Sequence, residues 1–136
     1  MSASRGLPRG EPSTWLVLAL SAVFVSLGVL FLAAPRWGAA LFGLPAPEGA
    51  GFFYLPAIGL RDLAFGLYLL ALARLSDARA VATVLAITTV IPVGDVIIVA
   101  LARGWSLHIL LHAFSGLVMA ASAAWLFARS RSASEP

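Results

Sequence analysis

The stretch FFYLPAIGLRDLAFGLYLLALAR, residues 52–74, decides the fold of this chain. A helix needs about 20 mostly apolar residues to cross a bilayer, and this stretch is long enough. It also carries Arg61 and Asp62 near its middle. A charge at the centre of a bilayer costs about 2.5–3.5 kcal/mol, so such residues usually face a bundle interior or a cavity. The stretch therefore predicts a membrane-spanning helix and, within it, the place of a polar site.

Three further apolar stretches have a similar length: residues 14–34, 79–102 and 105–128. Of the 136 residues, 61% are hydrophobic and only 11% are charged. A soluble domain of this size would have too much surface to cover with so few charges. The sequence thus predicts an all-α bundle of four transmembrane helices, with one domain at 14–128 between flexible tails at 1–13 and 129–136.

Two connecting features have local structural consequences. Residues 35–51 are amphipathic and aromatic, with Pro and Gly stops, which fits a short interfacial helix and equally an ordinary apolar loop. Pro92 stands just before Asp95 in the third span. Because proline lacks an N–H group and leaves a carbonyl one turn upstream without its donor, we expect a kink there.

The arginines indicate the topology. Six of them flank one side of the expected bundle and two the other, in this order: Arg5, Arg9, Arg74, Arg79, Arg129 and Arg131, against Arg36 and Arg103. The positive-inside rule then predicts a multi-pass protein of the cell (inner) membrane with both termini in the cytoplasm. The arginines form no patch and there is no lysine, so no nucleic-acid partner is expected. The bias towards Ala, Gly and Arg suggests a bacterial source.

Five ionisable groups are expected at comparable depth in the outer half of the bundle: Arg61, Asp62, Asp95, His108 and His112. Helical spacing puts Thr88 on the same face as Asp95, and Asp62 on the same face as Gly59 and Gly66. In the last span it aligns a second set along one stripe: His108, His112, Ser115, Met119 and Ser122. Gly116, Ala120 and Ala124 form a neighbouring small-residue ridge suited to helix packing.

These residues give a specific hypothesis for a site. Arg61 and Asp62 are neighbours about 100° apart on a helix, so we expect Arg61 to pair with Asp95 and Asp62 to pair with a histidine. Asp62, Asp95 and His112 are the candidate catalytic groups. The candidate ligand-binding side chains are Arg61, Tyr54, Tyr68 and His108.

Plainer explanations stand beside this hypothesis. The buried charges can simply fix helix register, and His108 lies close enough to the surface to be an interfacial histidine. The His-x-x-x-His spacing can bind a metal, but no supporting pattern surrounds it and no metal site is expected. No cysteine and no nucleotide motif is present, so no cofactor is expected.

The segment Ala57-Ile58-Gly59-Leu60-Arg61-Asp62-Leu63-Ala64-Phe65-Gly66 resembles the signature of a family of small four-helix membrane proteins catalogued as a domain of unknown function. Phe42-Gly43-Leu44-Pro45, Gly94-Asp95 and His112 support the resemblance, which covers residues 15–128. More loosely, the layout is similar to the DoxX-like group. The resemblance implies the fold and a membrane location, and no particular activity.

Three functions compete. The first is a membrane enzyme or binding protein for a lipophilic small molecule, in which Asp62 or Asp95 acts with His112 and Arg61 holds an anion or developing negative charge. Isomerisation, cyclisation or epoxide opening fits a chain without a cofactor. The second is a proton- or ion-coupled transporter, which would require a homo-oligomer. The third is a structural or accessory subunit. The bilayer is the common partner of all three.

Overall fold

The computed structural model describes residues 6–8 and 10–132, all of whose regular structure is helical. Its elements are α1 (Pro12–Ala33), α2 (Pro35–Phe42), the 3-10 helix η1 (Gly49–Phe53), α3 (Tyr54–Leu75), α4 (Ala78–Thr88), α5 (Val90–Arg103) and α6 (Leu107–Ser132). Four segments are long and apolar enough to cross a membrane: Pro12–Ala33, Gly49–Leu75, Ala78–Arg103 and Leu107–Ser132. The predicted all-helical fold is confirmed, with four helices long and apolar enough to cross a membrane.

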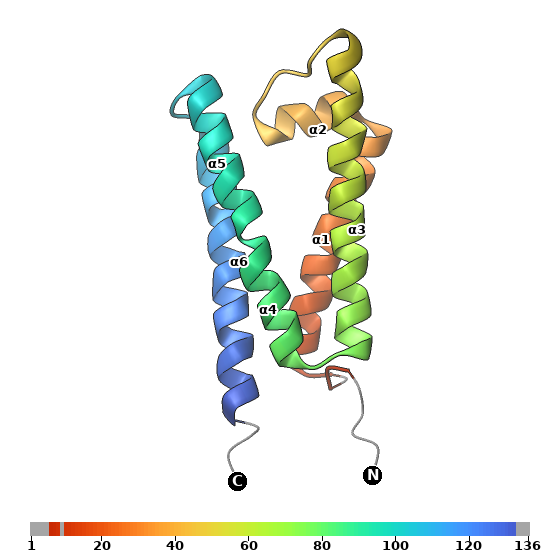
Figure 1. The fold of residues 1–136 in the computed structure, drawn as a ribbon, viewed down its shortest axis with the longest axis vertical. Coiled ribbons are helices and arrows are strands. Elements are labelled where there is room, and N and C mark those ends of the chain that lie inside the picture. The colour runs from red at the N-terminus through yellow and green to blue at the C-terminus, as the bar shows by residue number, and fades with distance from the viewer. Residues whose placement is uncertain (1–5, 9, 133–136) are drawn as a thin grey trace.

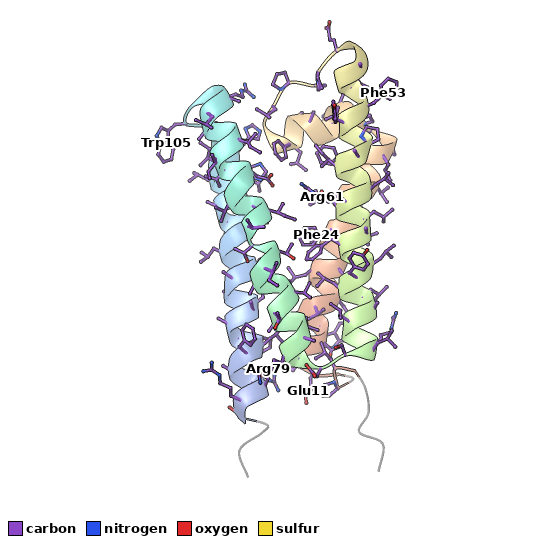
Figure 2. All side chains as sticks on the ribbon, viewed as in Figure 1. Glu11, Phe24, Phe53, Arg61, Arg79 and Trp105 are labelled. Carbon is purple, nitrogen blue, oxygen red and sulfur yellow. The ribbon has the colours of Figure 1, made fainter. Side chains whose placement is uncertain are left out.

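The long helices form two antiparallel pairs (Figure 1). α1 packs mainly on α3, whereas α4 and α5 both pack on α6. α1 begins and α6 ends at one end of the bundle, called here the terminal end. The short helix α2 crosses the opposite end, called here the α2 end (Figure 1). Figure 2 shows Glu11 and Arg79 near the terminal end, Phe53 and Trp105 near the α2 end, and Arg61 and Phe24 between them.

Glycines bring α1 and α3 into close contact. A Cβ atom on Gly28 would lie 2.6 Å from the backbone nitrogen of Leu63, and one on Gly66 would lie 2.8 Å from that of Val25. The Ser21 hydroxyl donates to the Gly66 carbonyl at 2.7 Å. Small residues let membrane helices approach this closely without a hydrophobic driving force. The predicted face of Gly59, Asp62 and Gly66 is therefore real, because all three are buried.

The terminal end is filled by an apolar core. Its buried members come from the N-terminal segment and four helices: Leu7, Val17, Leu20, Phe65, Leu69, Ala73, Val81, Ala82, Leu85, Met119, Ala123 and Leu126. The backbone N–H of Leu7 donates to the Ala73 carbonyl at 2.9 Å. Part of the predicted flexible tail thus belongs to the core. Residues 1–5 and 9, which include Arg5 and Arg9, lie outside the described residues.

The third span is broken where Pro92 predicts a kink. α4 ends at Thr88 and α5 begins at Val90. Pro92 cannot donate to the Thr88 carbonyl. The Thr88 and Thr89 hydroxyls also donate back to the carbonyls of Val84 and Leu85 at 2.7 and 3.0 Å, a type of bond that often bends helices. The helix is thus interrupted at Thr89, within one turn of Pro92, at the place where the sequence predicts a kink.

The last helix is longer than expected from the sequence. α6 continues to Ser132, past the predicted end at residue 128. Arg129 donates to Glu11 Oε2 at 2.9 Å and lies over the Trp125 ring at 5.3 Å. These contacts hold the final turn of α6 against the start of α1. In the predicted small-residue ridge only Gly116 is buried, since Ala120 and Ala124 are exposed on the outside of α6.

Candidate functional site

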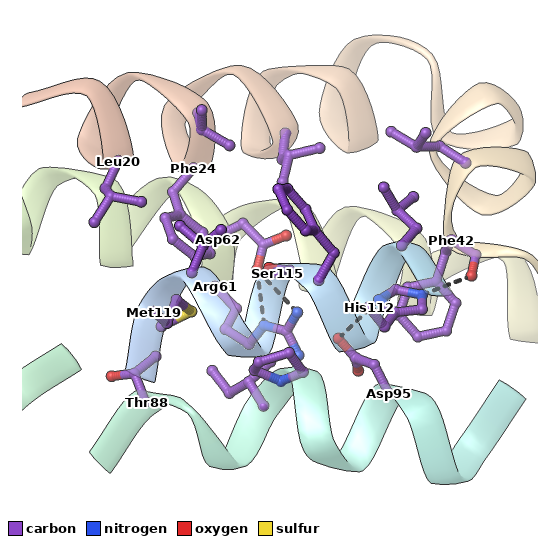
Figure 3. Close-up of a pocket in the computed structure, with 18 of the residues that line it drawn as sticks. Leu20, Phe24, Phe42, Arg61, Asp62, Thr88, Asp95, His112, Ser115 and Met119 are labelled. Atoms are coloured by element: carbon purple, nitrogen blue, oxygen red, sulfur yellow. Dashed lines mark hydrogen bonds and ion pairs between the residues drawn. The ribbon is translucent and has the colours of Figure 1, made fainter. Parts of the chain in front are cut away.

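A cavity of about 370 Å³ lies between the helices in the half of the bundle next to α2. Most of its lining is apolar and aromatic. The lining residues are Leu20, Val23, Phe24, Leu27, Phe31, Leu41, Phe42, Ile91, Pro92, Leu111, Phe114, Val118 and Met119, with the polar residues Arg61, Asp62, Thr88, Asp95, His112 and Ser115 (Figure 3). An apolar cavity with a few convergent polar groups is the usual form of a small-molecule site.

The first polar group of the cavity is an ion pair within α3. Arg61 binds Oδ1 of Asp62 through Nε and Nη2, both at 2.9 Å. The predicted pairing of Arg61 with Asp95 is therefore wrong. The 100° between neighbouring residues separates their Cβ directions, but the long arginine side chain bends back along the helix to reach Asp62. The Asp62 side chain is 9% exposed and that of Arg61 is 44% exposed, so the acid is buried and the guanidinium reaches into the cavity.

The second polar group joins α5 and α6. Nδ1 of His112 lies 3.7 Å from Oδ2 of Asp95, and both side chains are nearly buried. The prediction that Asp62 pairs with a histidine is wrong, because Asp62 is paired with Arg61 and the histidine faces Asp95 of α5. The pair is called here the Asp95–His112 dyad. Its separation is longer than a hydrogen bond, and such distances commonly shorten when a ligand binds.

The other nitrogen of His112 is held by α2. Nε2 of His112 donates to the Phe42 carbonyl at 2.9 Å, and the two rings are 4.8 Å apart. A carbonyl oxygen only accepts, so Nε2 carries the hydrogen and, in the neutral ring, Nδ1 keeps the free lone pair. The backbone of α2 thereby fixes the ring so that Nδ1 faces Asp95.

A second hydrogen bond holds the same end of α2. Nη1 of Arg103 donates to the Gly43 carbonyl at 2.9 Å. The last carbonyls of a helix lack partners within the helix and carry partial negative charge, so a histidine and an arginine suit them. Gly43 has φ of 99°, and a Cβ there would lie 2.5 Å from Cγ of His108. His108 therefore packs against Gly43 and does not belong to the cavity lining.

The remaining predicted ligand-binding residues lie elsewhere. Tyr54 and Tyr68 are 73% and 65% exposed and are outside the cavity lining. They share a helical face with Arg61, as the spacing predicts. That face points away from the bundle, and only the flexible arginine is long enough to turn from it into the cavity. The structure thus brings together Arg61, Asp62, Asp95 and His112, and leaves both tyrosines and His108 apart.

The sequence predicts some residues of the cavity lining and gives no indication of others. The spacing correctly gathers Thr88 with Asp95, and His112 with Ser115 and Met119, on the cavity lining. The aromatic wall from Phe24, Phe31 and Phe42 gave no signal, because a cavity-facing phenylalanine and a lipid-facing one look alike in an apolar span. The Phe42 and Gly43 carbonyls were also missed, although Gly43 is a typical residue for a helix end. Among the described residues no group of three metal-binding side chains forms.

Four long apolar helices around a cavity with two acid-containing pairs define a multi-pass helical membrane protein with a polar site inside its bundle. The chain belongs to the family described as "Domain of unknown function (DUF4267)", whose model matches residues 21–126. That match includes Arg61, Asp62, Asp95 and His112. The comparisons with curated proteins and with solved structures give no match.

Proposed function

We propose that the protein binds a lipophilic small molecule in the cavity and transforms it by acid–base chemistry at the Asp95–His112 dyad. The main support for this proposal is the position of the dyad, because an acid and a base face each other on the wall of a largely apolar cavity. Positioned acids and bases of this kind contribute about 10²–10⁴-fold to rates of proton transfer.

Each polar residue has a distinct role in this proposal. Asp95 and His112 Nδ1 exchange one proton with the ligand, giving it at one position and taking one back at another. Arg61 donates N–H groups to a ligand oxygen that gains negative charge during the transfer. Asp62 does not touch the ligand and positions the Arg61 guanidinium through its two contacts at 2.9 Å. Such a reaction is an isomerisation, a cyclisation or an epoxide opening.

The alternative of a purely structural subunit has less support. In that role the buried charges would link helices, but Arg61 and Asp62 lie on the same helix, and their pair fixes no helix–helix register. Asp95 and His112 join α5 to α6, which already pack together. A transport pathway also has less support, because the apolar core described above fills the terminal end beneath the cavity.

The membrane placement forms part of the proposal. The Ala, Gly and Arg bias supports a bacterial source and hence the inner membrane. The arginine distribution supports both termini in the cytoplasm, with α2 as an interfacial helix at the outer surface. Its four-helix layout also supports kinship with the DoxX-like group. A reporter fused to the C-terminus should be active only in the cytoplasm, and activity on the outside would contradict this topology.

The chemistry can be tested without knowing the substrate. The full chain in lipid nanodiscs is incubated in D₂O with a lipid extract, and mass spectrometry follows carbon-bound deuterium in the lipophilic compounds. We expect the wild type to deuterate a compound, and Asp95→Asn and His112→Gln each to lower the rate at least about a hundredfold. His108→Gln and Glu48→Gln are matched controls, because neither residue lines the cavity. Equal rates for Asp95→Asn and wild type would contradict the proposal, and no deuteration by the wild type would remove its chemical step.

A further inference from the structure

The cavity has a rim on the side where α1 faces α6. Val23 and Phe114 both line the cavity, yet they are 53% and 64% exposed. Val23 comes two residues after Ser21, which bonds to α3, so it lies about 200° around α1 from that contact. Phe114 comes two residues before Gly116, which packs on Pro92 of α5, so it too lies about 200° from its helix partner. Both side chains thus point away from the contact within their own helix pair, and both border the cavity.

Two more residues complete this rim. Leu41 of α2 and Leu111 of α6 line the cavity and are 42% and 44% exposed. The rim formed by Val23, Leu41, Leu111 and Phe114 is called here the lateral opening. All four side chains are apolar, and α1 and α6 each pack mainly on other helices rather than on one another. In a membrane this opening faces lipid tails, so a molecule dissolved in the bilayer can enter without passing through water.

The charges inside the cavity restrict what can enter. Arg61 is paired with Asp62, and His112 faces Asp95. Each of these four ionisable side chains thus already has a partner of its own in the cavity. A charged ligand would therefore have to leave water without gaining a counter-charge, which is costly in a low-dielectric site. A hydroxyl or carbonyl group can instead accept from Arg61, since two of the five guanidinium N–H groups suffice for Asp62.

The size of the cavity points the same way. About 370 Å³ is near the lower end of the range for ligand sites, about 300–1,000 Å³. A headgroup-bearing lipid with two chains does not fit into this volume. One chain with a small polar end does fit, and any remaining length can extend through the apolar lateral opening.

We propose that the ligand is an uncharged single-chain lipid with one hydroxyl or carbonyl group, and that it enters from the bilayer through the lateral opening between α1 and α6. This inference rests on the proposed function of the cavity and adds its ligand class and route. The polar end lies between Arg61 and the Asp95–His112 dyad. The chain packs against Phe24 and Phe31 and passes Val23 and Phe114.

The ligand class is tested by photolabelling. A straight-chain fatty alcohol with a diazirine in its chain is added to nanodiscs of the full-length protein, beside the carboxylate and quaternary ammonium of the same chain. Peptide mass spectrometry after irradiation should locate the alcohol on residues 20–31 and 111–119. The two charged probes should label these segments at least about tenfold less, because their charge must be buried without a partner. Equal labelling by the carboxylate or the ammonium would overturn the uncharged ligand class.

The route is tested by the rate at which labelling develops after mixing. Val23→Trp should narrow the lateral opening and slow labelling several-fold, whereas Phe114→Ala should widen it and speed labelling. Val29→Trp and Leu117→Ala are matched controls on the same helices, 50% and 66% exposed and outside the cavity lining. If Val23→Trp is not stably folded, Leu111→Trp on the opposite side of the opening takes its place. Rates unchanged from these controls would overturn the lateral route.

A third variant separates this inference from the proposed function. Ser115→Phe places a ring inside the cavity and should abolish labelling of both segments at all times. If it does so while Val23→Trp has no effect, the cavity binds lipid but the route is wrong. If Ser115→Phe labels as strongly as wild type, the alcohol is not in the cavity and the inferred ligand class falls. Loss of deuterium exchange in Asp95→Asn, with unchanged labelling by the alcohol, would show that Asp95 is needed for the chemistry and not for ligand binding. The two proposals are then judged by separate measurements.

Discussion

The two halves of the bundle are built from the same four helices but pack differently. At the terminal end, leucines and valines from both helix pairs meet in a core, and Leu69, Val81 and Leu85 are fully buried there. At the α2 end the pairs separate around a cavity that contains Arg61 and the Asp95–His112 dyad. The glycine contacts hold α1 close to α3, so the gap lies between this pair and the pair that α6 forms with α4 and α5. The break in the third span, between Thr88 and Val90, lies where the closed half gives way to the open half, since Leu85 belongs to the core and Thr88 lines the cavity.

The largest difference between the halves should appear when a leucine is shortened. Leu85→Ala removes a side chain that is 0% exposed in the closed half, and we expect it to lower the free energy of unfolding by about 2–5 kcal/mol. Leu111→Ala, at the rim of the open half, should cost less than about 1 kcal/mol. Reversible unfolding in mixed micelles measures both. Equal losses would show that the α2 end is as tightly packed as the core.

The next effect concerns the contact between α1 and α3. Gly28→Ala puts a Cβ 2.6 Å from the Leu63 backbone, which cannot move aside as a side chain can, and should cost about 1–3 kcal/mol of stability. Gly94→Ala is the matched control, because nothing lies within 4 Å of its Cβ position. The same unfolding measurement applies. A neutral Gly28→Ala would mean that the two helices are not held together by this close approach.

The break in the third span should respond to a single substitution. Pro92→Ala restores an N–H group for the Thr88 carbonyl, and we expect a gain of about 1 kcal/mol in stability. α4 and α5 should straighten, which brings α5 towards α1 and reduces the cavity. Distances between spin labels on α1 and α5 measure this change. Pro56→Ala, in the first turn of α3, is the control, and an unchanged distance in Pro92→Ala would assign the separation to another cause.

The smallest effect is expected at α2. Arg103→Gln weakens the bond to the Gly43 carbonyl, so the local opening free energy of the Phe42 and Gly43 amides should fall by about 0.5–1 kcal/mol. Hydrogen exchange reads this locally. Arg129→Gln removes an arginine contact at the other end and should leave α2 unchanged. Protection at α2 that is unaffected by Arg103→Gln would show that the Arg103 bond does not stabilise this end of the helix.

The sequence predicted the elements well for a physical reason. Four long apolar stretches, a proline inside the third and a Pro–Gly-bounded segment after the first are local signals, and each produced its helix, break or short helix. Helical spacing also gathered Thr88 with Asp95, and His112 with Ser115 and Met119. The predicted pairing of the charges was wrong, because the pairing depends on how far a flexible arginine can turn and on how α5 packs on α6.

By itself the sequence determined that the chain forms four helices long and apolar enough to cross a membrane, and that Arg61, Asp62, Asp95 and His112 lie within them. These properties follow from hydrophobic length, helical period and the cost of burying charge. Only the tertiary structure decided that Arg61 binds its neighbour, that His112 is shared between Asp95 and the Phe42 carbonyl, and that the site is a cavity. Those facts depend on the angle between two helix pairs, and that angle is set by contacts between residues far apart in the chain.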